Sequence, residues 1–184
     1  MSNKLFVISG PSGVGKGTIC KELLKNFDGA ILSISATTRP KSKMEQDGVS
    51  YFFKTNEEFD KLIAEDAFLE WAEFNGNRYG TLKSFVDDAL TKNNVILEID
   101  VQGAMQIKDK DIGAVLIFIS PPDSKTLLSR LRRRGRESEE EIEKRYYEAQ
   151  RELATMVEYN YVVVNDDLDR AVTEIKEIIK KEED

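Results

Sequence analysis

The stretch Gly10-Pro11-Ser12-Gly13-Val14-Gly15-Lys16-Gly17-Thr18 decides the fold of this chain. It follows an apolar run over residues 5–8 and precedes a helical pattern of apolar residues spaced four apart over 19–27. A glycine loop between a strand and a helix binds phosphate, because its N–H groups converge on an oxyanion and the helix N-terminus favours negative charge. Lys16 adds a point charge for the outer phosphates of a nucleoside triphosphate. A glycine-rich loop without function is the alternative, and the strand, spacing, lysine and helix together argue against it.

One position departs from the general pattern of this loop. In the general motif a Ser or Thr follows the lysine directly and binds magnesium, whereas this chain has Gly17 followed by Thr18. GTPases and motor ATPases rely on that hydroxyl. Several nucleoside monophosphate kinases carry Gly-Lys-Gly-Thr instead, so the departure favours a small-molecule phosphotransferase over a switch protein.

Bulk composition excludes several classes of protein. With 184 residues the chain suits one domain with a substantial core. A net charge of -7 argues against a generally basic nucleic-acid surface, whereas a local Lys/Arg pocket suffices for a nucleotide. The absence of histidine excludes His-ligated metals, His bases and Ser-His-Asp triads. The single cysteine, Cys20, excludes an internal disulfide and is expected to be a small packed side chain.

The chain shows no pattern that points to a membrane. We see no secretory signal, and the longest apolar run, residues 114–119, is too short to cross a bilayer. We therefore expect a cytoplasmic protein without a membrane or nucleic-acid partner. A monomer and a homo-oligomer both remain open.

The order of the patterns predicts an α/β fold in which a parallel sheet has helices on both faces. Apolar strands alternate with amphipathic helices in a core of about residues 1–33, 83–124 and 147–184. A short strand is predicted near residues 30–35. An irregular, strand-rich insertion of about residues 34–82 then interrupts the alternation of strands and helices, and a helical lid is expected over about 125–146.

Local signals mark several element ends in these segments. Strand character resumes at residues 51–53, and residues 75–77 (NGN) predict a hairpin turn. Thr55 with Glu58, and Ser138 with Glu141, each predict a capping box at the start of a helix.

Charged residues gather in two places of chemical interest. The arginines cluster late in the chain, at Arg130, Arg132, Arg133, Arg134, Arg136 and Arg145. Arg134 and Arg145 on a flap could neutralise charge on transferring phosphates, whereas a solvated helix face is the alternative for Arg132, Arg133 and Arg136. The second place is the apolar strand predicted over residues 95–100, which ends in Asp100 with Glu98 two residues earlier and so on the same face. A carboxylate at that strand end is suited to magnesium.

Taken together, the ordered motifs resemble those of guanylate kinases over nearly the whole chain. The matching stretches are residues 8–16 (ISGPSGVGK), 35–39 (SATTR), 70–74 (EWAEF), 79–81 (YGT), 99–103 (IDVQG) and 164–168 (VNDDL). The resemblance implies a P-loop kinase-like fold with a small mixed NMP-binding insertion and a helical lid. It also implies transfer of the terminal phosphate of ATP to GMP, and to dGMP, with Mg²⁺ as cofactor.

The resemblance also assigns residues. Those expected at ATP are the loop residues Gly10, Pro11, Ser12, Gly13, Val14, Gly15, Lys16, Gly17 and Thr18, together with Arg130 and Asn165. Those expected at GMP are Ser35, Arg39, Tyr51, Glu70, Tyr79, Thr81, Glu98 and Asp100. The expected catalytic residues are Lys16, Arg39, Arg134 and Arg145. Magnesium is expected to be held mainly by phosphates and water, with Asp100 and Thr18 as possible protein ligands.

The chemistry of guanine agrees with three of these residues. Guanine offers donors at N1 and the 2-amino group, which the Glu70 carboxylate can accept as a pair, and its O6 needs a hydroxyl such as Ser35 or Thr81. Adenine shows the reverse pattern on that edge. One position departs from the family, because Ser42 stands where a second arginine is usual. Lys43 beside it can supply charge but no planar fork, so GMP affinity is expected to be weaker, unless Lys43 substitutes.

Two other functions compete with this prediction. Kinase-like modules of membrane-scaffold proteins bind partners without phosphorylating them, and they generally lack an intact phosphate loop, which is present here. A kinase for another monophosphate would share the core but differ in the base pocket, and Glu70 with Ser35 argues against it.

Overall fold

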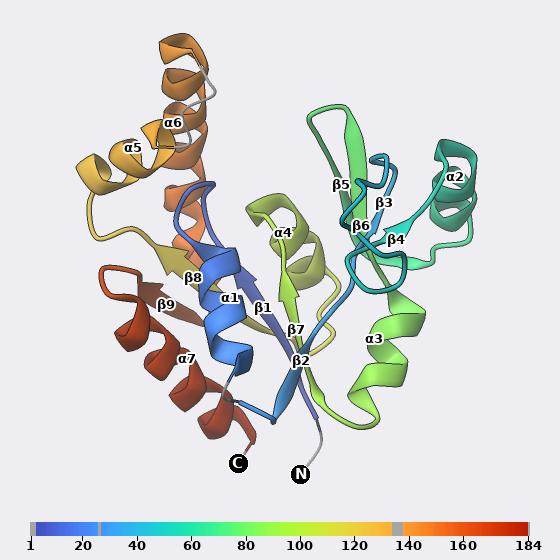
Figure 1. Ribbon diagram of the computed structural model, residues 1–184. Coiled ribbons are helices and arrows are strands. Elements are labelled where there is room, and N and C mark those ends of the chain that lie inside the picture. The colour runs from blue at the N-terminus through green and yellow to red at the C-terminus, as the bar shows by residue number, and fades with distance from the viewer. Residues whose placement is uncertain (1–2, 26, 134–137, 184) are drawn as a thin grey trace.

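The fold is built on a five-stranded parallel sheet (Figure 1). The computed structural model describes residues 3–25, 27–133 and 138–183. The strands lie in the spatial order β2 (Ala30–Leu32), β7 (Asn94–Glu98), β1 (Leu5–Ser9), β8 (Val115–Ser120) and β9 (Tyr161–Val164). Every residue of β1 is buried, as expected of a central strand with both faces covered.

Helices cover both faces of this sheet, which confirms the predicted fold class. Alternate residues of β1 point to opposite faces, so Phe6 and Ile8 join one hydrophobic cluster while Leu5 and Val7 join another. The helices on the Phe6 face are α1 (Lys16–Lys25), α5 (Ser124–Arg132), α6 (Glu139–Leu153) and α7 (Leu168–Glu183). Those on the other face are α3 (Lys83–Leu90) and α4 (Val101–Asp109).

A second, mixed sheet carries the region between β2 and α3. Its spatial order is β4 (Phe52–Phe53), β3 (Ala36–Thr37), β6 (Asn77–Leu82) and β5 (Phe68–Phe74). Helix α2 (Asn56–Ala64) packs on it through Phe59, and begins at the predicted capping box of Thr55 and Glu58. The predicted hairpin turn is present between β5 and β6, where Asn75 and Gly76 both adopt positive φ.

Two arms rise from the core in Figure 1, one made of the mixed sheet with α2 and the other of α5 and α6. Helix α6 starts at a capping box formed by Ser138 and Glu141 and continues without a break to Leu153. A short 3₁₀ helix, Ala154–Glu158, links it to β9. The sequence predicted that residues 34–82 form an insertion and residues 125–146 a lid, each moving relative to the core. That division stays a prediction.

Three predicted element boundaries are wrong. Strand β7 ends at Glu98, not at Asp100, because Asp100 leaves the sheet to cap α4: its Oδ1 accepts the Gly103 N–H at 2.8 Å. The argument that Glu98 and Asp100 share a strand face therefore fails. The strand predicted over 30–35 is split, since β2 ends at Leu32 and the chain joins the second sheet at Ala36. The strand predicted to resume at Tyr51 begins at Phe52.

Candidate active site

The glycine loop joins β1 to α1 and packs directly on its neighbours. Gly10 has a φ of 144°, and a Cβ there would lie 2.3 Å from the carbonyl oxygen of Ile119 in β8. Gly15 has a φ of 98°, and a Cβ there would lie 2.7 Å from the Asn165 side-chain nitrogen. Glycine is therefore required at both positions for conformation and for space.

Two polar side chains stabilise this loop by hydrogen bonds to its backbone. Asn165 is buried, and its Nδ2 donates to the Val14 carbonyl at 2.7 Å. Arg130 donates to the same carbonyl at 3.3 Å and to the Asn165 carbonyl at 2.9 Å. Both residues thus brace the loop, while contact of either with ATP stays a prediction.

The loop lysine is anchored on the loop itself. Lys16 Nζ donates to the carbonyl oxygens of Gly10, at 2.6 Å, and Pro11, at 3.3 Å. Burial lowers the pKa of Lys16, and the nearby carboxylates of Glu152, Glu98 and Asp100 oppose that shift. Incoming phosphates would replace the carbonyls as partners of the ammonium group.

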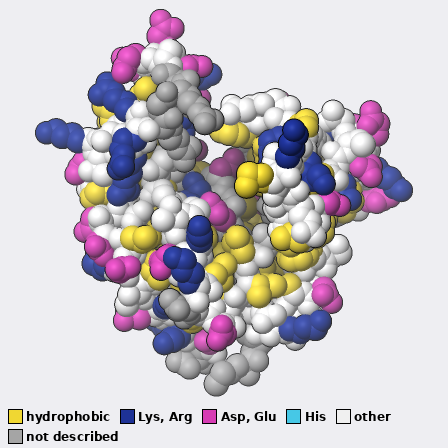
Figure 2. Space-filling model, viewed as in Figure 1, with side chains coloured by type: hydrophobic (Ala, Val, Ile, Leu, Met, Phe, Trp, Pro, Cys, Tyr) yellow, Lys and Arg dark blue, Asp and Glu magenta, His cyan; other side chains and the backbone are white. Residues whose placement is uncertain are grey.

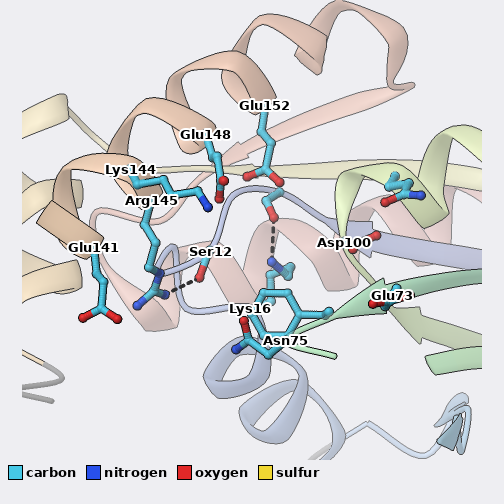
Figure 3. Close-up of a pocket in the computed structure, with 13 residues that line it drawn as sticks. Ser12, Lys16, Glu73, Asn75, Asp100, Glu141, Lys144, Arg145, Glu148 and Glu152 are labelled. Carbon is cyan, nitrogen blue, oxygen red and sulfur yellow. Dashed lines mark hydrogen bonds between the residues drawn. The ribbon is translucent and has the colours of Figure 1, made fainter. Parts of the chain in front are cut away.

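A cleft of about 860 Å³ opens above this loop, between the two arms. Figure 2 shows the hollow and Figure 3 the side chains that line it. The lining residues are Gly10, Ser12, Lys16, Glu73, Phe74, Asn75, Asp100, Gln102, Glu141, Lys144, Arg145, Glu148 and Glu152. They come from the core, from the tip of the β5–β6 hairpin and from α6, so the arms and the loop face one space.

One face of α6 supplies the charged wall of the cleft. Arg145 Nη2 donates a hydrogen bond to the Ser12 hydroxyl at 2.6 Å, so this predicted arginine contacts the phosphate loop. Arg134 lies outside the described residues. The sequence analysis missed Glu148 and Glu152, although their spacing from Glu141 and Arg145 (four, three and four residues) places all of them on one helix face. Burial raises the pKa of Glu152, while Lys16 opposes the shift.

The acid expected to contact guanine is buried on the mixed sheet. Glu70 is 5% exposed, and its Oε1 accepts a hydrogen bond from the Thr81 hydroxyl at 2.6 Å. Burial raises the pKa of Glu70 to about 7; the negative charge of Asp100 adds to the shift, and the Thr81 hydrogen bond opposes it. Ser35 lies just before β3, where its carbonyl accepts the Phe52 N–H at 2.9 Å. The structure thus joins Glu70 to Thr81 directly.

The residues expected at the GMP phosphate form a second group. The Arg39 guanidinium lies over the Tyr51 ring, 5.3 Å from its centroid, and the Tyr51 and Tyr79 rings are 6.2 Å apart. Arg39 also makes a bidentate ion pair with Glu45, at 2.5 and 3.1 Å, which the sequence analysis missed. That pairing lowers the pKa of Glu45 to about 2. The sequence feature that could have predicted this ion pair is the presence of one acidic residue in the otherwise basic segment of residues 39–46.

The unusual glycine of the loop has a structural explanation. A Cβ on Gly17 would lie 3.2 Å from Glu98 Oε1, so the missing side chain lets that carboxylate approach α1. Thr18 is exposed and lies outside the set of cleft-lining residues, whereas Asp100 is part of that set. Asp100 therefore lines the cleft and Thr18 does not, while magnesium binding by either residue stays a prediction.

A P-loop on a parallel sheet, facing an arginine-bearing helix and a small sheet with a buried carboxylate, defines a P-loop kinase of the nucleoside monophosphate kinase class. Within that class the chain belongs to the guanylate kinase family, whose model matches residues 2–182. The match bears out the resemblance seen in the sequence, and together with the relatives described next it shows that the protein is an enzyme of this family.

Individual relatives agree with this assignment. A guanylate kinase from Caldanaerobacter subterraneus subsp. tengcongensis is 55% identical over 176 residues, which cover 95% of this chain and 85% of the relative. One from Thermotoga maritima is 45% identical over 183 residues, covering 99% and 88%. The crystal structure of guanylate kinase from Anaplasma phagocytophilum matches with a TM-score of 0.76 at 31% identity, covering 98% and 86%. Shikimate kinase from Bacteroides thetaiotaomicron, at 14% identity and a TM-score of 0.56, shares the fold.

No helix in the described ranges is long and apolar enough to cross a membrane.

Proposed function

We propose that this enzyme transfers the terminal phosphate of ATP to GMP, and to dGMP, giving ADP and the nucleoside diphosphate. The observation that carries the choice of acceptor is the buried Glu70 carboxylate, paired with Thr81 on the mixed sheet, whose strand β3 leads directly to Arg39. This carboxylate presents acceptors to the N1–H and 2-amino group of guanine. Family membership supports the same substrate pair. The net charge of -7 argues against a nucleic-acid partner, and the proposed setting is cytoplasmic.

The donor binds on the phosphate loop. Backbone N–H groups of residues 12–16 and the N-terminus of α1 surround the β-phosphate, and Lys16 exchanges its carbonyl partners for phosphate oxygens. Arg145, already bonded to Ser12, offers its guanidinium to the transferring group and offsets the charge on its equatorial oxygens. These groups stabilise the transition state and require no proton transfer.

The cleft suits a magnesium ion that is held mainly by phosphates and water. The described residues contain no cluster of three or more acids with the geometry of a metal cage. Asp100 lines the cleft near Lys16, and Mg²⁺ in kinases is typically held by one or two carboxylates plus substrate phosphates. Asp100 would hold the ion together with substrate phosphates and water, and the ion would supply positive charge that neutralises part of the phosphate charge.

In the transfer step, a phosphate oxygen of GMP attacks the terminal phosphorus of ATP, and the bond from that phosphorus to the bridging oxygen of ADP breaks. Arg39, whose guanidinium lies over the Tyr51 ring, holds the GMP phosphate in line for the transfer. The phosphate takes the place of Glu45 as a partner of the guanidinium. The hairpin tip at Phe74 and the α6 wall border the same cleft, so their approach would exclude water and prevent wasteful ATP hydrolysis.

The proposed function is tested by steady-state kinetics with ATP and each of GMP, AMP, UMP and dTMP. We expect kcat/KM for GMP to exceed that for each other monophosphate by at least about a hundredfold. A base without the two guanine donors would leave the buried Glu70 carboxylate without hydrogen bonds, which costs binding free energy. Comparable efficiency with another monophosphate would contradict the assignment of the base site.

The raised pKa of Glu70 predicts a pH dependence for GMP binding. With a pKa of about 7, the carboxyl group of the free enzyme is largely protonated at lower pH and must lose its proton to accept both guanine donors. We therefore expect KM for GMP to fall as pH rises from about 6 to about 8, with KM for ATP changing much less. Glu70→Gln is the control, because it keeps the titration of the GMP phosphate and removes that of Glu70. The same slope in both proteins would contradict the role of Glu70.

A further inference from the structure

At Trp71, the outer edge of β5 is docked on helix α4 by the side-chain amide of Gln106. Strand β5 is the edge strand of the mixed sheet and pairs with β6 only. On its other side, the Trp71 N–H donates to Gln106 Oε1 at 3.1 Å, and Gln106 Nε2 donates to the Trp71 carbonyl at 2.8 Å. The Gln106 amide therefore takes the place that a neighbouring strand's peptide group would have in a ladder.

The same helix contacts β5 on both sides of Glu70. Lys110 Nζ donates to the Phe68 carbonyl at 3.1 Å, and Leu69 is buried in the core cluster that contains Ala104 of α4. The register of β5 against β6 shifts between Phe68 and Glu70, an irregularity that re-aims side chains in many strands near active sites. This part of β5 is therefore held by α4 as well as by its own sheet.

The carboxylate of Glu70 lies against the backbone of α4. A Cβ on Gly103 would stand 2.6 Å from Glu70 Oε2, so the two elements approach more closely there than any other residue type would permit. Gln106 lies three residues further along α4, one turn away on the same helix face. A slip of β5 along α4 would move the Glu70 carboxylate relative to this backbone and to Thr81.

We propose that Gln106 is a positioning residue for base recognition: its two hydrogen bonds to the Trp71 peptide fix β5 on α4 and so hold the Glu70 carboxylate where guanine binds. The proposal rests on the proposed function, since it assumes that Glu70 contacts the base. The amide pair is partly open to solvent, where lost hydrogen bonds are largely replaced by water. Its effect should therefore appear in GMP binding rather than in stability.

The test is Gln106→Met, which keeps the length of the side chain and removes both hydrogen bonds. The matched control is Lys108→Met, on another face of α4, where Nζ donates to the Glu158 carbonyl at 2.9 Å and pairs with the Glu158 carboxylate. We expect Gln106→Met to raise KM for GMP about fivefold and to reduce GMP/AMP discrimination by a similar factor, because two partly exposed hydrogen bonds are lost. We expect kcat and KM for ATP to change less than about twofold, and the control to leave all four values near wild type.

Amide hydrogen exchange supplies a readout that does not depend on activity. The Trp71 N–H should exchange faster in Gln106→Met than in wild type or Lys108→Met, all without nucleotide. If wild type fails to use GMP, the proposed function is wrong, and the exchange experiment still tests the docking of β5. Faster exchange with unchanged KM for GMP would overturn the positioning role, as would equal losses of kcat and thermal stability in both variants. Unchanged exchange would overturn the docking itself.

Discussion

Lys16→Ala is expected to lower kcat with ATP and GMP by about 10²–10³-fold while the protein stays folded. Among the residues that the structure describes, the hydrogen-bond partners of the Lys16 ammonium group are the Gly10 and Pro11 carbonyls of its own loop, at 2.6 and 3.3 Å from Nζ. Few tertiary contacts therefore disappear with the side chain. What disappears is a point charge beside the phosphates undergoing transfer, in a cleft where partial burial strengthens electrostatic interactions.

The measurement is kcat and KM for both substrates, with circular dichroism and thermal unfolding as checks of the fold. Lys21→Ala is the matched control, since Lys21 is an exposed lysine of the same helix α1 and its replacement makes the same change of charge. The control is expected to behave as wild type. Near-normal turnover by a folded Lys16→Ala protein would mean that the loop does not act on the transferred phosphate.

Glu70→Gln is expected to lower kcat/KM for GMP by about tenfold or more and to leave KM for ATP nearly unchanged. The substitution keeps the size of the side chain but replaces one acceptor with a donor, which faces a guanine donor in one amide orientation. Each factor of ten corresponds to about 1.36 kcal/mol of transition-state stabilisation. ATP is expected to be unaffected, because the phosphate loop and Glu70 lie on different sheets.

The same variant separates function from stability. The pKa of Glu70 is raised above its ordinary value in the folded protein, so this carboxyl group destabilises the fold progressively as pH rises from about 4.5 through about 7. Glu70→Gln should therefore unfold at the same temperature as wild type or a higher one at pH 8, while it loses GMP efficiency. Glu57→Gln, an exposed acid on α2 of the same arm, is the control for a change of charge. Unchanged GMP/AMP discrimination in Glu70→Gln would mean that guanine is read elsewhere.

Much of the architecture follows from local sequence. The loop of residues 10–18 predicts a strand before it and a helix after it, because only glycine tolerates positive φ and close backbone packing at Gly10 and Gly15. The capping boxes at Thr55 and Ser138 mark the starts of α2 and α6 for an equally local reason, since each cap bonds a backbone group three residues away. Such features need only their near neighbours in the chain.

The site depends on contacts between distant segments. Local pattern assigned Asp100 to a strand, whereas the N–H groups of α4 gave it a more favourable place as a helix cap. Burial raises the pKa of Glu70 to about 7, and the charge of Asp100, 30 residues away in the chain, adds to the shift. Gln106 meets Trp71 across 35 residues of chain. Glu45 and Glu152 gain their importance only beside Arg39 and Lys16.

The sequence alone therefore determined the loop, the alternation of strands and helices, and the family, because these follow from residue type and spacing. Only the tertiary structure decided which acids are buried, paired or aimed into the cleft, since desolvation and Coulomb interaction depend on distances that folding creates.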